Sequence, residues 1–143
     1  MGPPVSMRTH CREQGVDFRG LDDASRRGEV ARVGQLLMAR IGAVVPVLPV
    51  PLVATVLLRD PQRAYSPLEL KAEVHALIDR VEAAGARVYI PRHDREYAID
   101  VGLRMLTLRR LVDERDGLLR PVADELPLLR YYAHSIEHIR RAA

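Results

Sequence analysis

The stretch from Ile41 to Leu58 constrains the fold of this chain more than any other, because it runs for 18 positions without a charged residue. That length just reaches what a helix needs to cross a lipid bilayer. However, Pro46, Pro49 and Pro51 stand in its middle. Each proline removes a backbone donor and breaks helical hydrogen bonding, and unsatisfied backbone groups are costly in hydrocarbon. The sequence therefore predicts a buried or interface-lying element here, and not a membrane span.

The same prolines predict where this stretch changes its conformation. The residues from Val44 to Val50 alternate proline with β-branched side chains, and we expect them to be extended because a residue before proline avoids the helical region. Pro51 then stands where the first position of a helix tolerates proline. We expect a short helix from Leu52 to about Leu58, and a central one, because it is apolar on every side.

The composition limits the kinds of core and partner that the chain can have. Aromatic residues make up 4% of the 143 residues, with no tryptophan and with Phe18 as the single phenylalanine, so the core must be aliphatic. So few aromatic rings also disfavour the stacking platforms that bind single-stranded nucleic acid. The net charge of +3 is mild. Cys11 is the only cysteine, which excludes a disulfide within the chain. The first residues lack the charged and apolar regions of a signal peptide.

Helix-start signals organise the first part of the chain. Asp22 or Asp23 can cap a helix that runs to about Arg40. The sequence Ser66-Pro67-Leu68-Glu69 is a capping box with proline at the first helical position, and it predicts a helix that stops at Gly85. The apolar residues aligned on these two helices are, in turn, Val30, Val33, Leu37 and Ile41, and Leu70, Val74, Leu77, Ile78 and Val81.

The second part begins with a short strand expected over Arg87 to Ile90. Asp94 is expected to cap the next helix, and Asp124 a terminal one. Asp116-Gly117 lies between two apolar pairs and is a signal for a hairpin turn. The apolar residues expected to form the buried faces of these two helices are, in turn, Val101, Met105, Leu108 and Val112, and Leu129, Tyr132, Ile136 and Ile139.

The order helix, helix, short strand, helix, hairpin is that of a winged-helix unit, here from about Pro51 to Pro121. The predicted fold class is therefore mainly α with a small β hairpin, a winged-helix-like helical domain flanked by an N-terminal and a C-terminal helix. Residues 1–21 are expected to form an irregular lead-in, and residues 22–143 the helical domain.

Two histidine motifs suggest chemistry, and neither supports a site. His134-Ser135-Ile136-Glu137-His138 matches H-x-x-E-H, in which imidazoles at i and i+4 share a helix face and could hold zinc. Only five residues follow His138, which leaves no downstream helix to supply a third ligand. His10 and Cys11 are adjacent, and neighbouring residues rarely present both groups to one substrate. There is also no glycine-rich phosphate loop. We therefore assign no catalytic, cofactor-binding or metal-binding residue, and we expect no cofactor.

A winged helix also raises the possibility of DNA binding. The helix before the hairpin would read the duplex, and its arginines would be Arg95, Arg104, Arg109 and Arg110. The hairpin tip, however, carries three acidic residues that would repel phosphate, namely Asp113, Glu114 and Asp116. A free winged-helix DNA-binding module therefore stays an alternative, and we expect no nucleic acid partner.

Three stretches together resemble the bacterial glycerol-3-phosphate acyltransferases. Gly2-Pro3-Pro4-Val5-Ser6 is similar to the segment that ends the acyltransferase domain in that family. The proline-rich stretch from Pro46 to Ala54 looks like the entry to the helical region that follows. The stretch from Leu128 to His138 is similar to the closing Leu-x-x-Tyr-Tyr-Ala-Asn-Ser-Ile-x-His of the family. Here His134 replaces the asparagine, and Glu137 replaces a small residue, which weakens the zinc interpretation further.

The resemblance implies a role in phospholipid synthesis but places no chemistry in this chain. The family uses a histidine base and an aspartate five positions after it to activate the glycerol hydroxyl. The residues five positions after the five histidines are Gly15, Arg80, Ala98, Ile139 and Ala143. The resemblance thus implies the non-catalytic C-terminal portion of the enzyme, with residues 1–21 at the end of the acyltransferase domain and the substrate sites upstream of Met1.

The same resemblance implies partners and a location. The expected partner is the acyltransferase catalytic domain, with the membrane surface as a possible second one. The expected location is cytoplasmic and peripheral, at the inner face of the bacterial cytoplasmic membrane.

Overall fold

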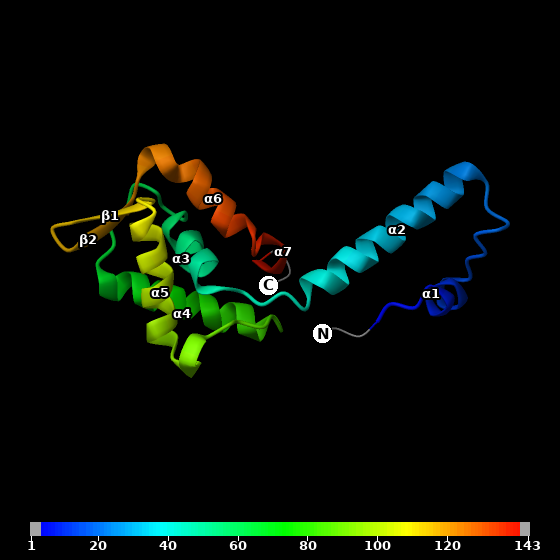
Figure 1. The fold of residues 1–143 in the computed structure, drawn as a ribbon, viewed down its shortest axis with the longest axis horizontal. Helices are drawn as coiled ribbons and strands as arrows, with labels where there is room; N and C mark the ends of the chain where they lie inside the picture. The colour runs from blue at the N-terminus through cyan, green and yellow to red at the C-terminus, as the bar shows by residue number, and fades with distance from the viewer. Residues whose placement is uncertain (1–3, 141–143) are drawn as a thin grey trace. The chain divides into compact units, whose positions relative to one another are not determined.

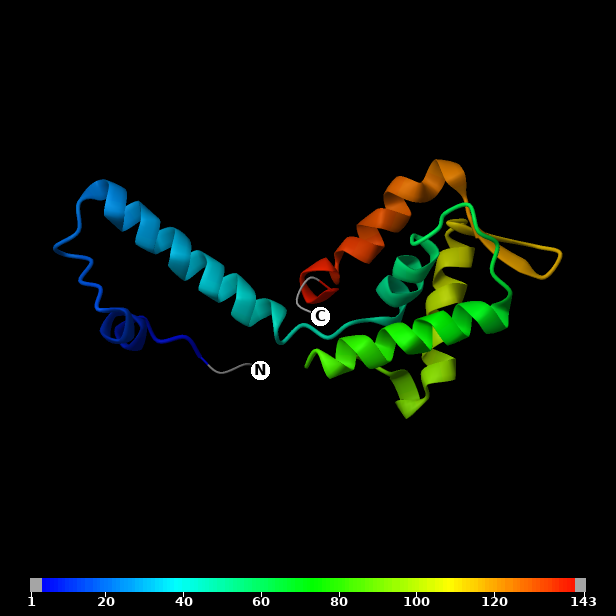
Figure 2. The ribbon, with the colours of Figure 1, turned by 180° about the vertical axis from the view of Figure 1, so that it is seen from behind.

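The computed structural model describes residues 4–140, apart from the side chains of His138 and Arg140. The chain divides into two compact units, one that ends at Val45 and one that begins at Pro46. Figures 1 and 2 show the elements of each unit from opposite sides. Helices dominate, and a two-stranded antiparallel hairpin is the one sheet of the described residues. The prediction of a mainly α fold with a small β hairpin is confirmed.

The first unit contains two helices, each with a capped start. Helix α1, Met7–Gln14, begins after Ser6, whose hydroxyl accepts a hydrogen bond from the Thr9 amide, and ends at Gly15 with φ 64°. Helix α2, Asp23–Gly42, begins after Asp22, whose carboxylate accepts from the Ser25 amide. The prediction of a helix capped here is confirmed, and the cap is the first of the two aspartates.

The apolar stripe expected on α2 is mostly exposed. Val33 is buried, but the exposed fraction is 59% for Val30, 41% for Leu37 and 54% for Ile41. The charged side chain of Glu29 is buried instead, with Arg32 Nη1 2.9 Å from its carboxylate. These apolar side chains do share one face of α2, as predicted, but α1 does not cover that face.

Helix α3, Pro49–Leu57, is the centre of the second unit. Every one of its residues except Val50 is buried, which confirms that the apolar run is a core element. Helices α4, α5 and α6 all pack on it, and both views show α3 among them (Figures 1 and 2). The expected start at Leu52 is wrong: the helix begins at Pro49, because proline is compatible with every position of the first turn, where no amide needs a helical acceptor.

Helix α4, Pro67–Ala83, follows its sequence signal closely. The Ser66 hydroxyl accepts from the Glu69 amide, and the Glu69 carboxylate accepts from the Ser66 amide at 2.9 Å, which completes the capping box. All five predicted inward residues are buried. The helix is followed by Gly85 at φ 83°, a conformation that glycine adopts without strain.

Helix α5, Arg95–Leu108, is capped by Asp94 as predicted, but it packs through a different face. The residues it buries are Ala98, Ile99, Gly102 and Leu106. Met105 and Leu108, expected to be buried, are exposed by 39% and 68%. The small residues explain the difference: a Cβ on Gly102 would lie 2.9 Å from the Pro49 carbonyl oxygen, so α5 approaches α3 more closely than any larger side chain would permit.

The hairpin consists of β1, Val112–Arg115, and β2, Leu118–Pro121. Arg115 pairs with Leu118 across a two-residue turn in which Asp116 has φ 54° and Gly117 has φ 72°, as the Asp-Gly signal predicts. Tyr65 and Leu119 exchange backbone hydrogen bonds of 2.9 and 2.8 Å, which fasten the hairpin to the segment before α4. The strand expected over Arg87 to Ile90 is reduced to a single parallel bridge between Val47 and Val88.

The terminal helix is interrupted. A 3-10 turn, Ala123–Glu125, precedes α6, Leu126–His134, and a second short helix, α7, covers Glu137–Arg140. Asp124 lies inside the 3-10 turn and caps nothing, since α6 begins after Glu125 without a side-chain cap. Of the predicted inward residues, Leu129 and Ile136 are buried, while Tyr132 and Ile139 pack on the core partly exposed. Over the described range, the helices all fall short of the length and apolarity needed to cross a membrane.

Candidate functional site

The residues of the H-x-x-E-H motif do not form a metal centre in the part of the chain that the structure describes. The side chain of His134 is 66% exposed, and its Nε2 lies 3.6 Å from a carboxylate oxygen of Glu137. The side chain of His138 lies outside the described residues. A search for three or more metal-ligating side chains within residues 4–140 finds none that could hold an ion.

His10 and Cys11 lie on α1, where neither has a catalytic partner. The Nε2 atom of His10 is buried without a hydrogen-bond partner among the described residues, and Cys11 is half-buried. His10 lines a depression of about 240 Å³ with polar residues of α1 and α2, among them Glu13 and Arg40. Because the imidazole is not paired with a nucleophile or an orienting carboxylate, the pair does not make a catalytic site.

A polar network joins α4 to α5. Lys71 Nζ lies 3.0 Å from Glu96 and 2.8 Å from Asp100, and His75 Nε2 lies 2.7 Å from Glu96 Oε1. The hydrogen bond with His75, followed by that with Lys71, lowers the pKa of Glu96 below its ordinary value. Hydrogen bonds to Asp100 and then to Glu96 raise the pKa of Lys71. This network joins the two helices through the ion pairs of Lys71 and the hydrogen bond between His75 and Glu96, so its contacts are those of a structural link.

The arginines of the would-be reading helix are largely engaged within the chain. Arg95 makes 2.7 Å ion pairs with Asp79 and with Glu82, both on α4. Arg109 and Arg110 lie beyond the end of α5, and the guanidinium of Arg109 hydrogen-bonds the Tyr132 hydroxyl. Arg104 remains on the exposed side of α5. The sequence placed four arginines on this helix, and the structure leaves one of them on its outer surface.

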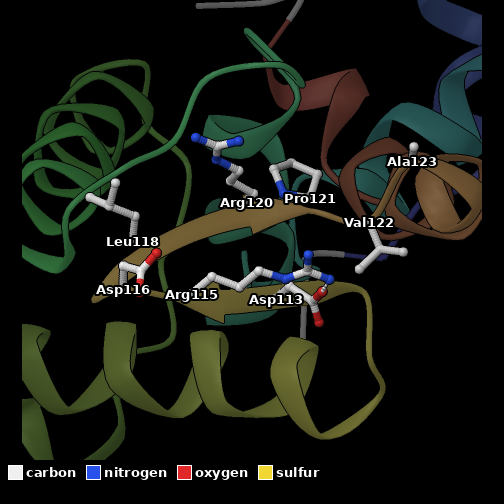
Figure 3. A pocket seen from close by; sticks show the side chains of 8 residues that line it. All are labelled: Asp113, Arg115, Asp116, Leu118, Arg120, Pro121, Val122 and Ala123. Atoms are coloured by element: carbon white, nitrogen blue, oxygen red, sulfur yellow. Dashed lines mark hydrogen bonds and ion pairs between the residues drawn. The ribbon is translucent and has the colours of Figure 1, made fainter.

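The outer face of the hairpin borders a hollow of about 370 Å³ (Figure 3). Asp113, Arg115, Leu118 and Arg120 project from this face because alternate residues of a strand point to the same side. Arg115 extends along β1 to Asp113, where the two side chains form a 2.9 Å ion pair. Charges of both signs line the hollow, so it offers no single charge for a ligand to match.

A second depression, of about 610 Å³, lies in the segment between α4 and α5. Its lining residues include the guanidinium groups of Arg92 and Arg95 and the imidazole of His93, and no carboxylate is among the described residues that line it. Arg92 and His93 both have φ 57°, a left-handed conformation that is rare for residues other than glycine. This backbone conformation could not be predicted from the sequence, because arginine and histidine do not mark a positive φ as glycine or asparagine would.

A run of exposed apolar side chains covers the end of α2 and the residues just after it, all in the first unit. In addition to Val30, Leu37 and Ile41, this run includes Met38, Val44 and Val45, each exposed by 40–68%. Clusters of exposed apolar side chains are a common mark of an interaction surface. We call it the α2 apolar surface, defined by Val30, Leu37, Met38, Ile41, Val44 and Val45.

Comparison with known proteins shows which family the chain resembles over most of its length. Residues 1–139 match the family described as the glycerol-3-phosphate acyltransferase C-terminal region. None of the curated proteins matches the chain.

Proposed function

This chain belongs to the glycerol-3-phosphate acyltransferase C-terminal region family, and on that premise we propose that it is the non-catalytic portion of a glycerol-3-phosphate O-acyltransferase. The parent reaction moves an acyl chain from a thioester donor to glycerol-3-phosphate in phospholipid biosynthesis. In this proposal the chain contributes by packing on the catalytic domain. Residues 1–21 form the end of the acyltransferase domain, and residues 22–143 form the C-terminal domain.

Two observations together support the proposal: the family match covers nearly the whole chain, and the catalytic histidine–aspartate pair of the family is missing from it. The match covers residues 1–139, while none of the five histidines has an aspartate five positions later. Without such a pair, no base is held near the hydroxyl that attacks the thioester. The described residues also hold no cluster of metal ligands that could replace it.

The α2 apolar surface supports packing against another domain. It is formed by one helix and the three residues that follow it, and Arg40 is its one charged residue between Leu37 and Val45. Burying such side chains contributes about 25 cal/mol per Å² of apolar area, so a domain that covers them gains stability. We propose that the catalytic domain covers this surface, and that the enzyme works at the inner face of the bacterial cytoplasmic membrane.

The first test is acyl transfer by the purified chain alone. We expect no transfer of a labelled acyl group to glycerol-3-phosphate, from either a coenzyme A or a carrier-protein thioester. Transfer that is lost on substitution of one of the histidines would show that the chain has its own active site, and would refute the non-catalytic role.

The second test adds the chain to the catalytic domain of a glycerol-3-phosphate acyltransferase that lacks its C-terminal region. We expect the two to co-elute and the activity of the catalytic domain to rise. Leu37→Asp should abolish co-elution, because it places a charge in the α2 apolar surface. Gln35→Asp is the matched control, since Gln35 is an exposed polar residue of the same helix. Equal loss with both variants, or no complex with the unmodified chain, would contradict the proposal.

The membrane surface is the competing occupant, and a vesicle assay separates it. If lipid covers the α2 apolar surface, the unmodified chain pellets with vesicles and stays bound at high salt, because the attraction is apolar. In that case Leu37→Asp releases the chain from vesicles. Binding to vesicles without binding to the catalytic domain would refute packing as the role of this surface.

A further inference from the structure

The depression between α4 and α5 has features that neither the family nor the packing role explains. It is lined by residues 88–93 and Arg95, all in the second unit, and has a volume of about 610 Å³. Arg92 and His93 line it with exposed side chains, and Tyr89, exposed by 55%, stands beside them. We propose that this depression binds an anion that carries a phosphate group.

The charge of the depression supports an anionic ligand. The charge of one of its two arginines, Arg95, is offset by ion pairs with Asp79 and Glu82. Arg92 has no such carboxylate partner among the described residues: its guanidinium carbon lies 4.4 Å from the centre of the Tyr97 ring. A cation over an aromatic face is held in place while its charge stays available. Arg92 is therefore positioned and not neutralised, which is what recognition of an anion requires.

The backbone supplies a separate observation. Arg92 and His93 are consecutive, and both have φ 57°. Side chains of L-residues are disfavoured there, because Cβ approaches the carbonyl oxygen. Residues held in sparsely populated backbone regions cluster at ligand sites, where the strained conformation directs the side chains. Here the strained pair directs the guanidinium of Arg92 and the imidazole of His93 to one depression, and an extended pair would send successive side chains to opposite sides.

The chemistry of the site suits phosphate in particular. A guanidinium offers parallel N–H donors that match two oxygens of a phosphate, and such bonds are stronger than neutral ones. A tyrosine hydroxyl can donate a further bond. A soluble phosphate ester and an anionic lipid headgroup both present this group, so the shared ligand is the phosphate itself. The experiment must then distinguish the two sources.

The chain offers a close control for a test of this site. Like Arg92, Arg110 is exposed, lies in the second unit and has a positive φ, in this case 59°. Unlike Arg92, it does not line the depression. Arg92→Gly and Arg110→Gly therefore remove the same charge and relieve the same backbone conformation. Glycine adopts a positive φ without strain, which favours the folded state of both variants. Arg92→Gly also removes the contact with the Tyr97 ring, so anion binding is the property in which the two variants are compared.

The measurement is a titration of the whole chain with inorganic phosphate at constant ionic strength, followed by backbone amide chemical shifts. We expect saturable shifts that concentrate in residues 89–96. Arg92→Gly should weaken phosphate binding at least about tenfold, the loss that removal of one charged hydrogen-bonding group produces. Arg110→Gly should leave the binding unchanged, and His93→Gln should weaken it by a smaller factor.

Vesicles of phosphatidylcholine with and without phosphatidylglycerol form the second arm. If phosphatidylglycerol vesicles perturb the same amides and inorganic phosphate competes, the ligand is a headgroup; if vesicles have no effect, it is a soluble phosphate. Either result supports the site. Shifts that are spread over the surface, or equal loss of binding in Arg92→Gly and Arg110→Gly, would reduce the effect to diffuse charge attraction and overturn the proposal. Neither result bears on packing against the catalytic domain, which Leu37→Asp tests separately.

Discussion

Replacing Gly102 with alanine tests the close contact between α5 and α3. A Cβ at this position would lie 2.9 Å from the carbonyl oxygen of Pro49, 3.0 Å from its carbonyl carbon and 3.1 Å from Cγ2 of Val53. Two of these three atoms belong to the backbone of α3, which cannot move aside as a side chain can. Because α3 is packed on by α4, α5 and α6, a shift of its backbone disturbs the whole core.

The magnitude follows from two opposed effects. Alanine is favoured over glycine inside a helix by about 1 kcal/mol. Overpacking a core costs about 1–3 kcal/mol, and contact with backbone places this case near the upper limit. We therefore expect Gly102→Ala to lower the free energy of unfolding by about 2 kcal/mol. For a unit of this size the midpoint of thermal unfolding should fall by about 10 °C.

The control is Gly34→Ala on α2, where nothing lies within 4 Å of the added Cβ. It should stabilise its helix by about 0.5–1 kcal/mol. Amide hydrogen exchange measures the stability of the two units separately. The protection of the α3 amides reports on Gly102→Ala, and that of the α2 amides reports on Gly34→Ala. An increase in the protection of α3 in Gly102→Ala would refute the close approach of α5, because the helix preference of alanine would then act unopposed.

Three more predictions concern the core and the polar network. The Thr55 hydroxyl is buried without a partner among the described residues, so Thr55→Val should stabilise the second unit by about 1 kcal/mol in urea unfolding, and a loss would reveal a hidden hydrogen bond. Leu57→Asp should prevent folding, because it buries a charge at a fully buried position, and a native-like circular dichroism spectrum would contradict this. The pKa of Glu96 is lowered when folded, so its contribution is present above its ordinary value of 4.5 and is lost as the pH falls below it. Glu96→Gln should reduce the pH dependence of the free energy of unfolding near and below pH 4.5. An unchanged pH dependence would show that other carboxylates cause it.

Local signals predicted the elements that depend on local chemistry. The capping box at Ser66 and the Asp-Gly turn at residues 116 and 117 specify their geometry within a few residues, and both are found as expected. The prediction of which face of α5 is buried was wrong, for a reason that a single sequence does not show. Large apolar residues mark a face that fills space, whereas Ala98 and Gly102 mark a face where two backbones meet.

The candidate site was harder to predict than the fold. The histidine motifs were the recognisable patterns in the sequence, and none of them was assigned to a site; in the structure the side chain of His134 is exposed. The cationic depression depends on the positive φ of Arg92 and His93, which tertiary structure imposes against their own preference. Likewise, the exposure of the α2 apolar surface depends on what packs against α2, and the helical period reveals only that the side chains share a face.

The central position of α3 has a consequence for synthesis on the ribosome. Helix α3 ends at Leu57 and α6, which covers one of its sides, begins at Leu126. Roughly 70 residues must be added in between, which takes about 4 to 14 s at ordinary translation rates. During that time the nearly all-apolar segment of α3 is not yet covered by α6. Apolar segments that are free to form strands can pair with other chains. Pro46, Pro49 and Pro51 cannot donate to a strand ladder, so the residues that set the start of α3 also protect the nascent chain from aggregation.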